Sequence, residues 1–517
     1  MNTEGKKALK AGTWYTISTF ILKGLAFITT PIFARLMSEE DVGNYANYIA
    51  WVTILTSVVT LDLFTSVNLA HFEYEGKPGH GIYPFISTIS LFGSACSIVF
   101  YGIALIFKEQ IMGWLGISEY MLHVMFIYFI VSPALSALHA KFRIYMQYKH
   151  TILTSLIPAI LSVLVAVLLV VLAPDDGKLS ARVTGYYGVW ILASLAIFVF
   201  VVARGRSFKW EYVRFALPIA LPMVLHTLSN ALLSLCDRVM IKNFCGDKDT
   251  AYYSIAYSCA MIISVLWQSV NQAWAPWVYE RMHKEETEQV TKVVRPIILL
   301  FSGGVLLVIL MAPELLLLMG GEKYAVAVDV VPPVMLGYIA QMLYTLYVNV
   351  EYFYKKQKQI MLGTMIAALL NIVLNWIFIP IFGYVAAAYT TLAGYIALLL
   401  IHYLFVRKMG RQGMYDMRFN LIVLVGSIVF GIAMTLLYRV DVVRFIIIGL
   451  AFGFLIFFLA RHRRELAKCL KKKDIVGILR VCRLMSKDKP GSRETGTEET
   501  GTEETGKKEI KPEETES

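Results

Sequence analysis

Long apolar runs recur along almost the whole chain, and they constrain its fold more than any other feature. About fourteen runs are long enough, at about 1.5 Å per residue, to cross a hydrocarbon layer about 30 Å thick. They cover residues 12–35, 45–70, 83–107, 121–140, 151–173, 184–203, 215–236, 251–278, 297–319, 331–352, 360–382, 386–405, 421–438 and 443–460. Because 57% of the residues are hydrophobic and only 16% are charged, most of this chain needs lipid as its solvent. The sequence therefore predicts an all-α polytopic membrane protein.

The first run is expected to remain as a helix. It is too long for a secretory signal, and Arg35 and the acidic stretch Ser38-Glu39-Glu40-Asp41 follow it where a cleavage site would need small residues. The six cysteines show no metal-ligand spacing, and we expect neither a disulfide nor a metal role for them.

Basic residues gather in alternate connections between the runs. One set contains Lys6, Lys7, Lys10, Lys141, Arg143, Lys149, Arg204, Arg206, Lys209, Arg214, Arg281, Lys284, Lys292, Arg295, Lys355, Lys356, Lys358, Arg407, Lys408, Arg411 and Arg418. The intervening connections are nearly free of them, so the positive-inside rule places the first set and both termini in the cytoplasm. This distribution, rather than affinity for nucleic acid, accounts for the net charge of +11. The exception is one exterior connection with Arg238, Lys242 and Lys248.

The end of the chain differs from the rest. Residues 461–485 mix basic and apolar side chains at helical spacing, which fits either a helix on anionic lipid or a solvated flank of the last span. Residues 486–517 repeat the unit GTEET and are predicted to be disordered.

No catalytic or cofactor motif is present in the chain. It lacks a GxxxxGK[ST] phosphate loop, an HExxH metal motif and a GxSxG nucleophile motif, and its loops are too short for an inserted catalytic domain. Energy for transport would therefore come from an ion gradient, from another protein or from the gradient of the substrate.

Two early spans carry charges that are expensive in lipid. Thr16, Lys23 and Thr30 share one face of the first span, followed by Pro31, where a kink could open the helix. Lys23 is predicted to face a cavity, the alternative being a side chain that reaches back to the interface. Asp62 in the second span is either a proton or cation site, a partner of Lys23, or half of a structural ion pair.

The seventh span carries a polar stripe. Pro218 and Pro222 predict a break in its first half, and four polar residues then follow at intervals of four, with Asp237 alongside. The stripe consists of His226, Asn230, Ser234 and Arg238. Further polar positions are Gln268, Asn271 and Gln272 in the eighth span and Asn371 and Asn375 in the eleventh, for most of which interhelical hydrogen bonding is the simpler explanation.

Spans one and seven lead from an arginine to a tyrosine-containing helix start, which suggests a duplicated six-helix unit. In five segments the sequence resembles the multidrug/oligosaccharidyl-lipid/polysaccharide exporter superfamily, and within it the polysaccharide-export flippases. The segments are Ala34-Arg35-Leu36-Met37 with Val42-Gly43-Asn44-Tyr45, residues 215–222 (FALPIALP), Asp237-Arg238 with Tyr253-Ser254-Ile255-Ala256, Ala312-Pro313 with residues 320–325, and residues 371–383 (NIVLNWIFIPIFG) before Ala386-Ala387-Ala388.

The resemblance implies two six-helix bundles, residues 1–203 and 204–406, around a cavity that opens alternately to the two sides, plus a helix pair at 407–460. It implies a plasma-membrane flippase, not an enzyme, that moves a polyprenyl-pyrophosphate-linked oligosaccharide for capsule or related envelope polysaccharide, alongside a polymerase and a chain-length regulator. Candidate substrate-binding residues are Lys23, Arg35 and Arg238 for the pyrophosphate and Asn230, Gln268 and Gln272 for the sugars. Asp62, His226 and Asp237 are candidates for ion coupling. No cofactor, metal or nucleic acid is implied.

Three other hypotheses compete with a flippase. A cation-coupled drug exporter would have an acidic rather than a basic cavity. A membrane-embedded polymerase or glycosyltransferase would need a large extramembrane loop with carboxylates. A lipid scramblase without gradient coupling would be hard to distinguish from the flippase.

Overall fold

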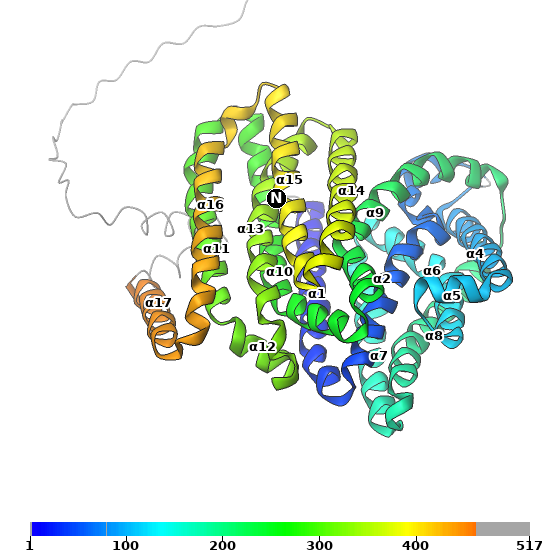
Figure 1. Ribbon diagram of the computed structural model, residues 1–517. Coiled ribbons are helices and arrows are strands. Elements are labelled where there is room, and N and C mark those ends of the chain that lie inside the picture. Colours follow the sequence, from blue (N-terminus) through cyan, green and yellow to red (C-terminus); the bar gives the residue numbers. More distant parts are fainter. Residues whose placement is uncertain (1–2, 79, 462–517) are drawn as a thin grey trace, which may run out of the picture.

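Every element of the computed structural model, which describes residues 3–78 and 80–461, is a helix (Figure 1). The first half contains α1 (Thr3–Leu36), α2 (Glu39–Thr60), η1 (Leu63–Ser66), α3 (Val67–Tyr74), α4 (Ile82–Ile106), α5 (Lys108–Leu115), α6 (Glu119–Ile144), α7 (Tyr148–Leu172), η2 (Asp175–Gly177) and α8 (Lys178–Gly205). The second half contains α9 (Trp210–Cys245), α10 (Asp247–His283), α11 (Thr287–Leu310), α12 (Ala312–Gly320), η3 (Glu322–Val330), α13 (Val331–Phe353), α14 (Gln357–Phe382), α15 (Val385–Lys408), η4 (Gln412–Met414), α16 (Met417–Thr435), η5 (Leu436–Arg439) and α17 (Asp441–Arg461).

Among the described residues, eleven helices are long and apolar enough to cross a membrane, or up to twelve if a bent pair counts as one span. The prediction of an all-α, multi-pass membrane protein is therefore confirmed. Helices α1 and α17 occupy the first and last predicted spans but are not among the eleven, so the total of about fourteen remains a prediction. The predicted surface segment beyond Arg461 and the predicted tail lie outside the described residues.

Two predicted spans are not continuous helices. The second bends by 57° because Leu61 and Asp62 adopt left-handed backbone angles, φ 57° and φ 42°, which a right-handed helix cannot contain. The ninth is divided at Met311, where Pro313 lies in the first turn of α12. Proline is well suited to the first turn of a helix, because its missing N–H group has no partner to lose there.

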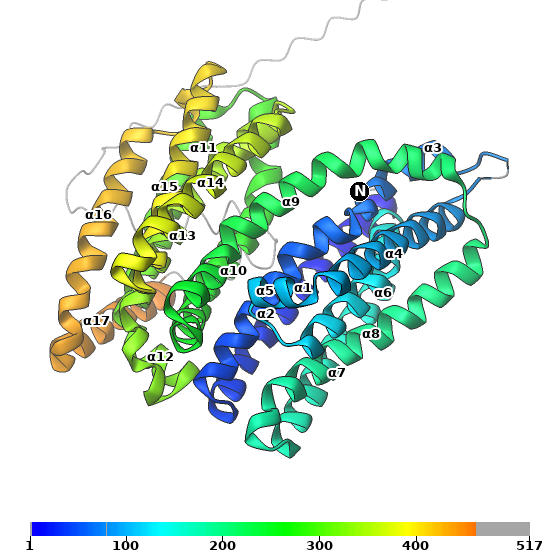
Figure 2. The ribbon, with the colours of Figure 1, turned by 45° about the vertical axis from the view of Figure 1, so that its right-hand side comes forward.

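The predicted break in the seventh span is wrong. Helix α9 runs without interruption from Trp210 to Cys245 through both Pro218 and Pro222, and Figure 2 shows it as one curved helix. Helix α1 likewise continues through Pro31. Such prolines are tolerated in membrane helices because neighbouring helices and local adjustment satisfy the carbonyl groups that proline leaves free.

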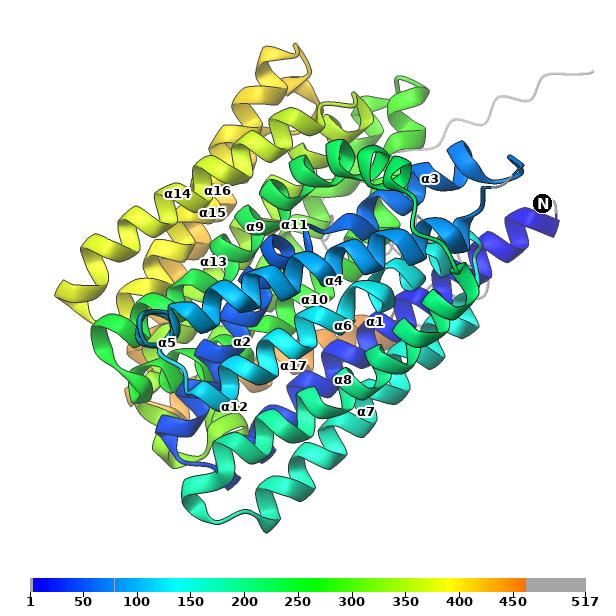
Figure 3. The same ribbon diagram turned by 90° about the vertical axis from the view of Figure 1, so that its right-hand side faces the viewer.

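Helix α9 connects two lobes, which we call the N lobe (α1–α8) and the C lobe (α10–α15). In its first half, Tyr212 and Ala216 are buried in one core cluster with Phe85 of α4. In its second half, Leu233 and Ile241 belong to a core cluster that lies mostly in the C lobe. The C-terminal helix α16 joins that lobe, where Asn420 donates a hydrogen bond to the Tyr347 hydroxyl over 3.2 Å. The N lobe faces the viewer in Figure 3.

The lobes meet where α2 and α10 begin, at the end that the charge pattern predicts to be exterior. The Lys242 ammonium donates to Asn44 and, over 2.6 Å, to Asp247, and Lys248 forms an ion pair with Glu40 at 3.2 Å. We call this set of contacts the outer seal.

Further contacts of the outer seal come from α1 and the segment around α12. Arg35 donates to the carbonyl oxygens of Leu317 and Leu318, over 3.3 and 2.9 Å, and Lys323 donates to that of Met37 over 2.9 Å. These contacts join the two lobes, so the structure is closed at the predicted exterior end.

Candidate functional site

A cavity of about 550 Å³ lies between the lobes and is lined by α1, α2 and α7–α10. Its lining includes Leu22, Leu25, Thr29, Thr30, Phe33, Val42, Tyr45, Ala46, Ile49, Ala159, Val163, Arg182, Tyr186, Trp190, Leu235, Arg238, Ser254, Ile255, Ser258 and Met261. Two arginines, Arg182 of α8 and Arg238 of α9, bring positive charge to it. Among these described lining residues there is no aspartate or glutamate.

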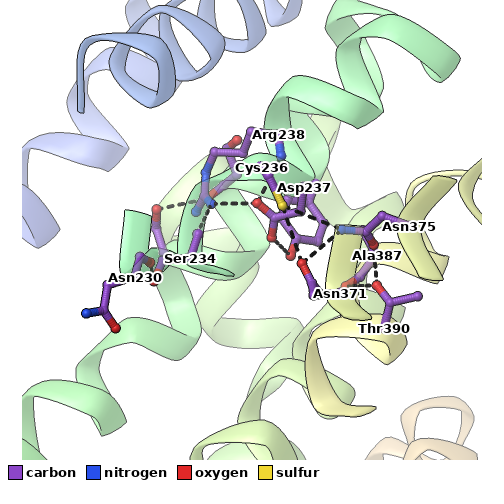
Figure 4. A network of polar contacts seen from close by, with 12 residues as sticks. Asn230, Ser234, Cys236, Asp237, Arg238, Asn371, Asn375, Ala387 and Thr390 are labelled. Atoms are coloured by element: carbon purple, nitrogen blue, oxygen red, sulfur yellow. Dashed lines mark hydrogen bonds and ion pairs between the residues drawn. The ribbon is translucent and has the colours of Figure 1, made fainter. Parts of the chain in front are cut away.

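Arg238 is held in place by its own helix and by α10. Its guanidinium donates to the Ser234 carbonyl oxygen over 3.0 Å and to the Asp237 carboxylate over 3.2 Å, and it lies 4.5 Å from the ring centroid of Tyr257 (Figure 4). Asp237 is only 1% exposed and also accepts a hydrogen bond from the Tyr253 hydroxyl. The geometry makes Asp237 the residue that orients Arg238 toward the cavity.

Arg182 is a cavity residue that our sequence analysis missed. Its guanidinium carbon lies 3.6 Å from the ring centroid of Tyr45 and 4.0 Å from that of Phe33, and one nitrogen donates to the Met37 sulfur over 3.7 Å. No carboxylate of the described residues lies within ion-pairing distance of it. A guanidinium held by aromatic faces keeps most of its hydrogen-bond donors for a ligand. The sequence could have identified it, because Arg182, like Arg238, is a basic residue on the predicted exterior side, where basic residues are scarce.

Lys23 pairs with another predicted site residue. Its ammonium donates to the side-chain oxygen of Gln268, which in turn donates to Ser264 over 3.1 Å, so α1 is joined to α10. The carboxyl group of Asp62, which we considered as a partner of Lys23, instead lies beside the hydroxyls of Ser57 and Thr227. The predicted face of the first span is therefore turned toward the C lobe.

The other predicted residues lie away from this cavity. Arg35 belongs to the outer seal. His226 and Asn230 contact each other over 3.1 Å, one turn apart on α9, and Asn230 is exposed. Gln272 is also exposed. Of the predicted site residues, all of them in the described part of the chain, Arg238 alone lines the cavity.

A second polar cluster, to the right of Arg238 in Figure 4, joins α9, α14 and α15. The amide oxygen of Asn371 accepts from the Cys236 thiol over 3.4 Å and from Asn375 over 3.2 Å. Thr390 donates to the side-chain oxygen of Asn375 and to the carbonyl oxygen of Ala387 over 3.0 Å. The prediction that Asn371 and Asn375 serve interhelical hydrogen bonding is thus confirmed.

The sequence profile of the family described as polysaccharide biosynthesis protein matches residues 8–282, and that of the MatE family matches residues 222–377. No curated protein matches the chain significantly in sequence.

Solved structures share the fold at low sequence identity. The lipid II flippase MurJ in an inward closed conformation has a TM-score of 0.65 and 16% identity, covering 87% of this chain and 99% of that one. An inward-facing multidrug resistance MATE family transporter of the MOP superfamily has a TM-score of 0.56 and 12% identity, covering 78% and 98%. An outward-facing structure, again of a multidrug resistance MATE family transporter of that superfamily, has a TM-score of 0.52 and 13% identity, covering 79% and 96%.

Proposed function

We propose, from the premise that this chain belongs to the polysaccharide biosynthesis protein family of the multidrug/oligosaccharidyl-lipid/polysaccharide exporter superfamily, that it is a flippase. Its substrate would be a polyprenyl-pyrophosphate-linked oligosaccharide, moved from the cytoplasmic to the outer leaflet of the plasma membrane for envelope polysaccharide biosynthesis. The protein would act as a transporter and not as an enzyme, beside a polymerase and a chain-length regulator.

The observation that carries this proposal is the pair of guanidinium groups in one cavity. Arg182 comes from the N lobe and Arg238 from α9, and no acidic residue accompanies them among the described lining residues. Planar guanidinium forks match phosphate oxygens in both geometry and charge, and a site of low polarity strengthens that interaction. The pyrophosphate would bind between these two residues. Lys23, on the face of α1 that is turned toward the C lobe, would add a third positive charge.

The remaining lining fits the rest of such a substrate. Tyr45, Tyr186 and Trp190 offer aromatic faces, and Ser254 and Ser258 offer hydroxyls, which together suit sugar rings. The polyprenyl tail would stay in lipid, because moving its apolar surface into water is unfavourable. With the outer seal closed, the structure corresponds to the state that would receive its substrate from the cytoplasmic side.

Transport then requires the outer seal to open while the cavity closes at its other end. A pyrophosphate bound to Arg182 of the N lobe and Arg238 of the connecting helix α9 would draw these two elements together, so part of its binding energy would favour this rearrangement. Asp62, His226 and Asp237 remain proposed ion-coupling residues; of these, Asp237 is in direct contact with Arg238.

A drug exporter remains the second candidate because the MatE profile also matches, over residues 222–377. Organic cations would need an acidic cavity, however, and the charge of the described lining residues is positive.

The test is whether lipid-linked oligosaccharide accumulates on the cytoplasmic leaflet of a deletion strain. The native chain should restore surface polymer, whereas Arg182→Ala, Arg238→Ala and Lys23→Ala should fail while reaching the membrane in normal amounts. Arg206→Ala is the matched control, since Arg206 is exposed outside the cavity. Normal surface polymer in the deletion strain, combined with sensitivity to cationic drugs, would replace the flippase by the exporter.

A further inference from the structure

An ion pair lies wholly inside the C lobe and has no part in the cavity. The Nδ1 atom of His402 in α15 lies 3.1 and 3.0 Å from the two carboxylate oxygens of Glu351 in α13. The two side chains are 1% and 0% exposed. Ionisable groups are rare in membrane helices because of the cost of burying their charge, and a buried pair of this kind is a reason to look for a function.

The pair is not fully satisfied by the protein. The Nε2 atom of His402 has no hydrogen-bond partner among the described residues, although it is buried. It faces Gly363 of α14, where an added β-carbon would lie 3.2 Å from Nε2. One turn from Gly363 toward the basic end of the helices, the buried side-chain oxygen of Gln359 likewise has no partner in the described structure. A buried imidazole nitrogen needs a hydrogen-bond partner such as a water molecule, whether or not it carries a proton.

The immediate surroundings of the pair are aromatic. Around His402, Tyr344 stacks on the imidazole with centroids 5.8 Å apart, and Phe405 meets it edge-on at 6.2 Å. No third charged side chain of the described residues is within ion-pairing distance of Glu351. The exposed basic residues that mark the predicted cytoplasmic end, Lys355 and Lys356 among them, follow Glu351 by about one helical turn.

A chain of contacts leads from this pair to the N lobe. Tyr344, whose ring stacks on His402, lies beside the side chain of Gln341, and the oxygen of Gln341 accepts a hydrogen bond from the Ser264 hydroxyl over 3.3 Å. Ser264 is the partner of Gln268, and Gln268 is the partner of Lys23. The path therefore crosses from α15 through α13 and α10 to α1, which is in the other lobe.

The cost of burying charge determines whether the pair keeps one shared proton. A single proton shared between Glu351 and His402 leaves the pair neutral overall, whether it resides on the imidazole or on the carboxyl group. Removing that proton leaves a net negative charge in a medium of low polarity, so the proton stays bound while the pair is enclosed. If the lobe rearranges and water reaches the pair, water can solvate the negative charge and the proton can leave.

We propose that the Glu351–His402 pair is a proton-binding site of the C lobe, and that its occupancy is coupled to Lys23 through Tyr344, Gln341, Ser264 and Gln268. The inference rests on the proposed transport function and names the proton as its coupling ion. The proton enters from water at the predicted cytoplasmic end and binds the pair in the outer-closed state. Amide side chains in the path transmit orientation rather than protons, so a change at the pair alters how Gln268 holds Lys23.

The experiment uses the full chain in lipid nanodiscs and needs no substrate. Spin labels at Asp175 and Glu322, both exposed near the predicted exterior end of different lobes, report the fraction of outer-closed molecules in a background without native cysteines. This fraction should change several-fold when the pH is lowered from about 8 to about 5. Glu351→Gln keeps a hydrogen bond to His402 but removes the ionisable group, and it should abolish the change.

Glu288→Gln is the matched control, because Glu288 is an exposed carboxylate on α11 with a side chain that is 81% exposed. It should behave as the native chain does. If Glu351→Gln retains the native pH dependence, the pair is only a structural contact and the proposal fails.

A second variant covers the case in which Glu351→Gln does not fold. Gly363→Ala adds a methyl group 3.0 Å from the Cε1 atom of His402 and should move the pH midpoint of the lobe distances. An unmoved midpoint overturns the proposal. The two proposals fail separately, because loss of pH coupling with intact polymer export rejects only the proton site, whereas normal polymer in a deletion strain rejects only the flippase.

Discussion

The backbone of Gly43 in α2 lies directly against the carbonyl oxygen of Asp247 at the start of α10, and a β-carbon added at Gly43 would overlap that atom. The approach is also close to Ala251, whose backbone nitrogen would lie 3.2 Å from the added carbon. Only glycine permits two helices to meet this closely at the outer seal. The identity of one residue therefore controls how tightly the lobes close.

Gly43→Ala should shift the protein out of the outer-closed state. The added methyl group must push α2 and α10 apart, and overpacking of this kind costs about 1 to 3 kcal/mol. Spin-label distances across the outer seal should lengthen in a large share of molecules. Gly304→Ala in α11 is the control, because an added β-carbon there meets open space. Distances identical to those of the native chain would show that the seal tolerates the methyl group.

Two lysines of the outer seal should differ in their contribution. Lys242 is 13% exposed and contacts both Asn44 and Asp247, so Lys242→Met should weaken the seal by about 1 to 3 kcal/mol, because it leaves both partners without their donor. Lys248 is 57% exposed, and Lys248→Met should cost less than about 1 kcal/mol. The share of outer-closed molecules, measured at low and at high salt, tests this order. Equal effects of both substitutions would contradict it.

Arg182 should bind phosphate through two hydrogen bonds and not only through its positive charge. Arg182→Ala should weaken binding of a short-chain polyprenyl pyrophosphate by about 10- to 100-fold, since a hydrogen bond to a charged group is worth about 1.5 to 3 kcal/mol. Arg182→Lys should recover only part of that loss. An ammonium lacks the planar pair of parallel N–H donors that a guanidinium presents to two phosphate oxygens, and it cannot stack flat on the Tyr45 ring. Calorimetry on the full chain measures both. Binding by Arg182→Ala that equals binding by Arg206→Ala would remove Arg182 from the site.

Arg444 should hold the last helix to the C lobe. Its side chain is 4% exposed and reaches Glu314 and Asp441 over 2.7 Å each, as well as the carbonyl oxygen of Leu310 over 3.4 Å. Arg444→Ala should lower the free energy of unfolding by about 2 to 3 kcal/mol, because it removes the hydrogen bonds of a buried guanidinium to Glu314 and to the Leu310 carbonyl. Thermal unfolding in detergent measures the loss. Arg439→Ala is the control at a nearby exposed position, and a loss of the same size there would contradict the prediction.

The sequence by itself determined the class of fold and much of its detail. Apolar length and the scarcity of charge require helices in lipid, since backbone groups there must bond within their own segment. Helical spacing likewise identified Lys23 as an unusual charge inside a span and Arg238 as the end of a polar stripe. The ends of the helices were harder to predict from the sequence. The bend at Leu61 and Asp62, for example, contains neither glycine nor proline.

Only the tertiary structure decided which residues meet. A helical period tells which side chains share a face, but it does not tell which of a dozen similar helices that face will meet. Lys23 was compatible with Asp62 as a partner, and packing of α1 against α10 gave it Gln268 instead. Packing within the N lobe places Arg182 against Tyr45 at the cavity. Closure of the two lobes, by contrast, places Arg35 in the outer seal.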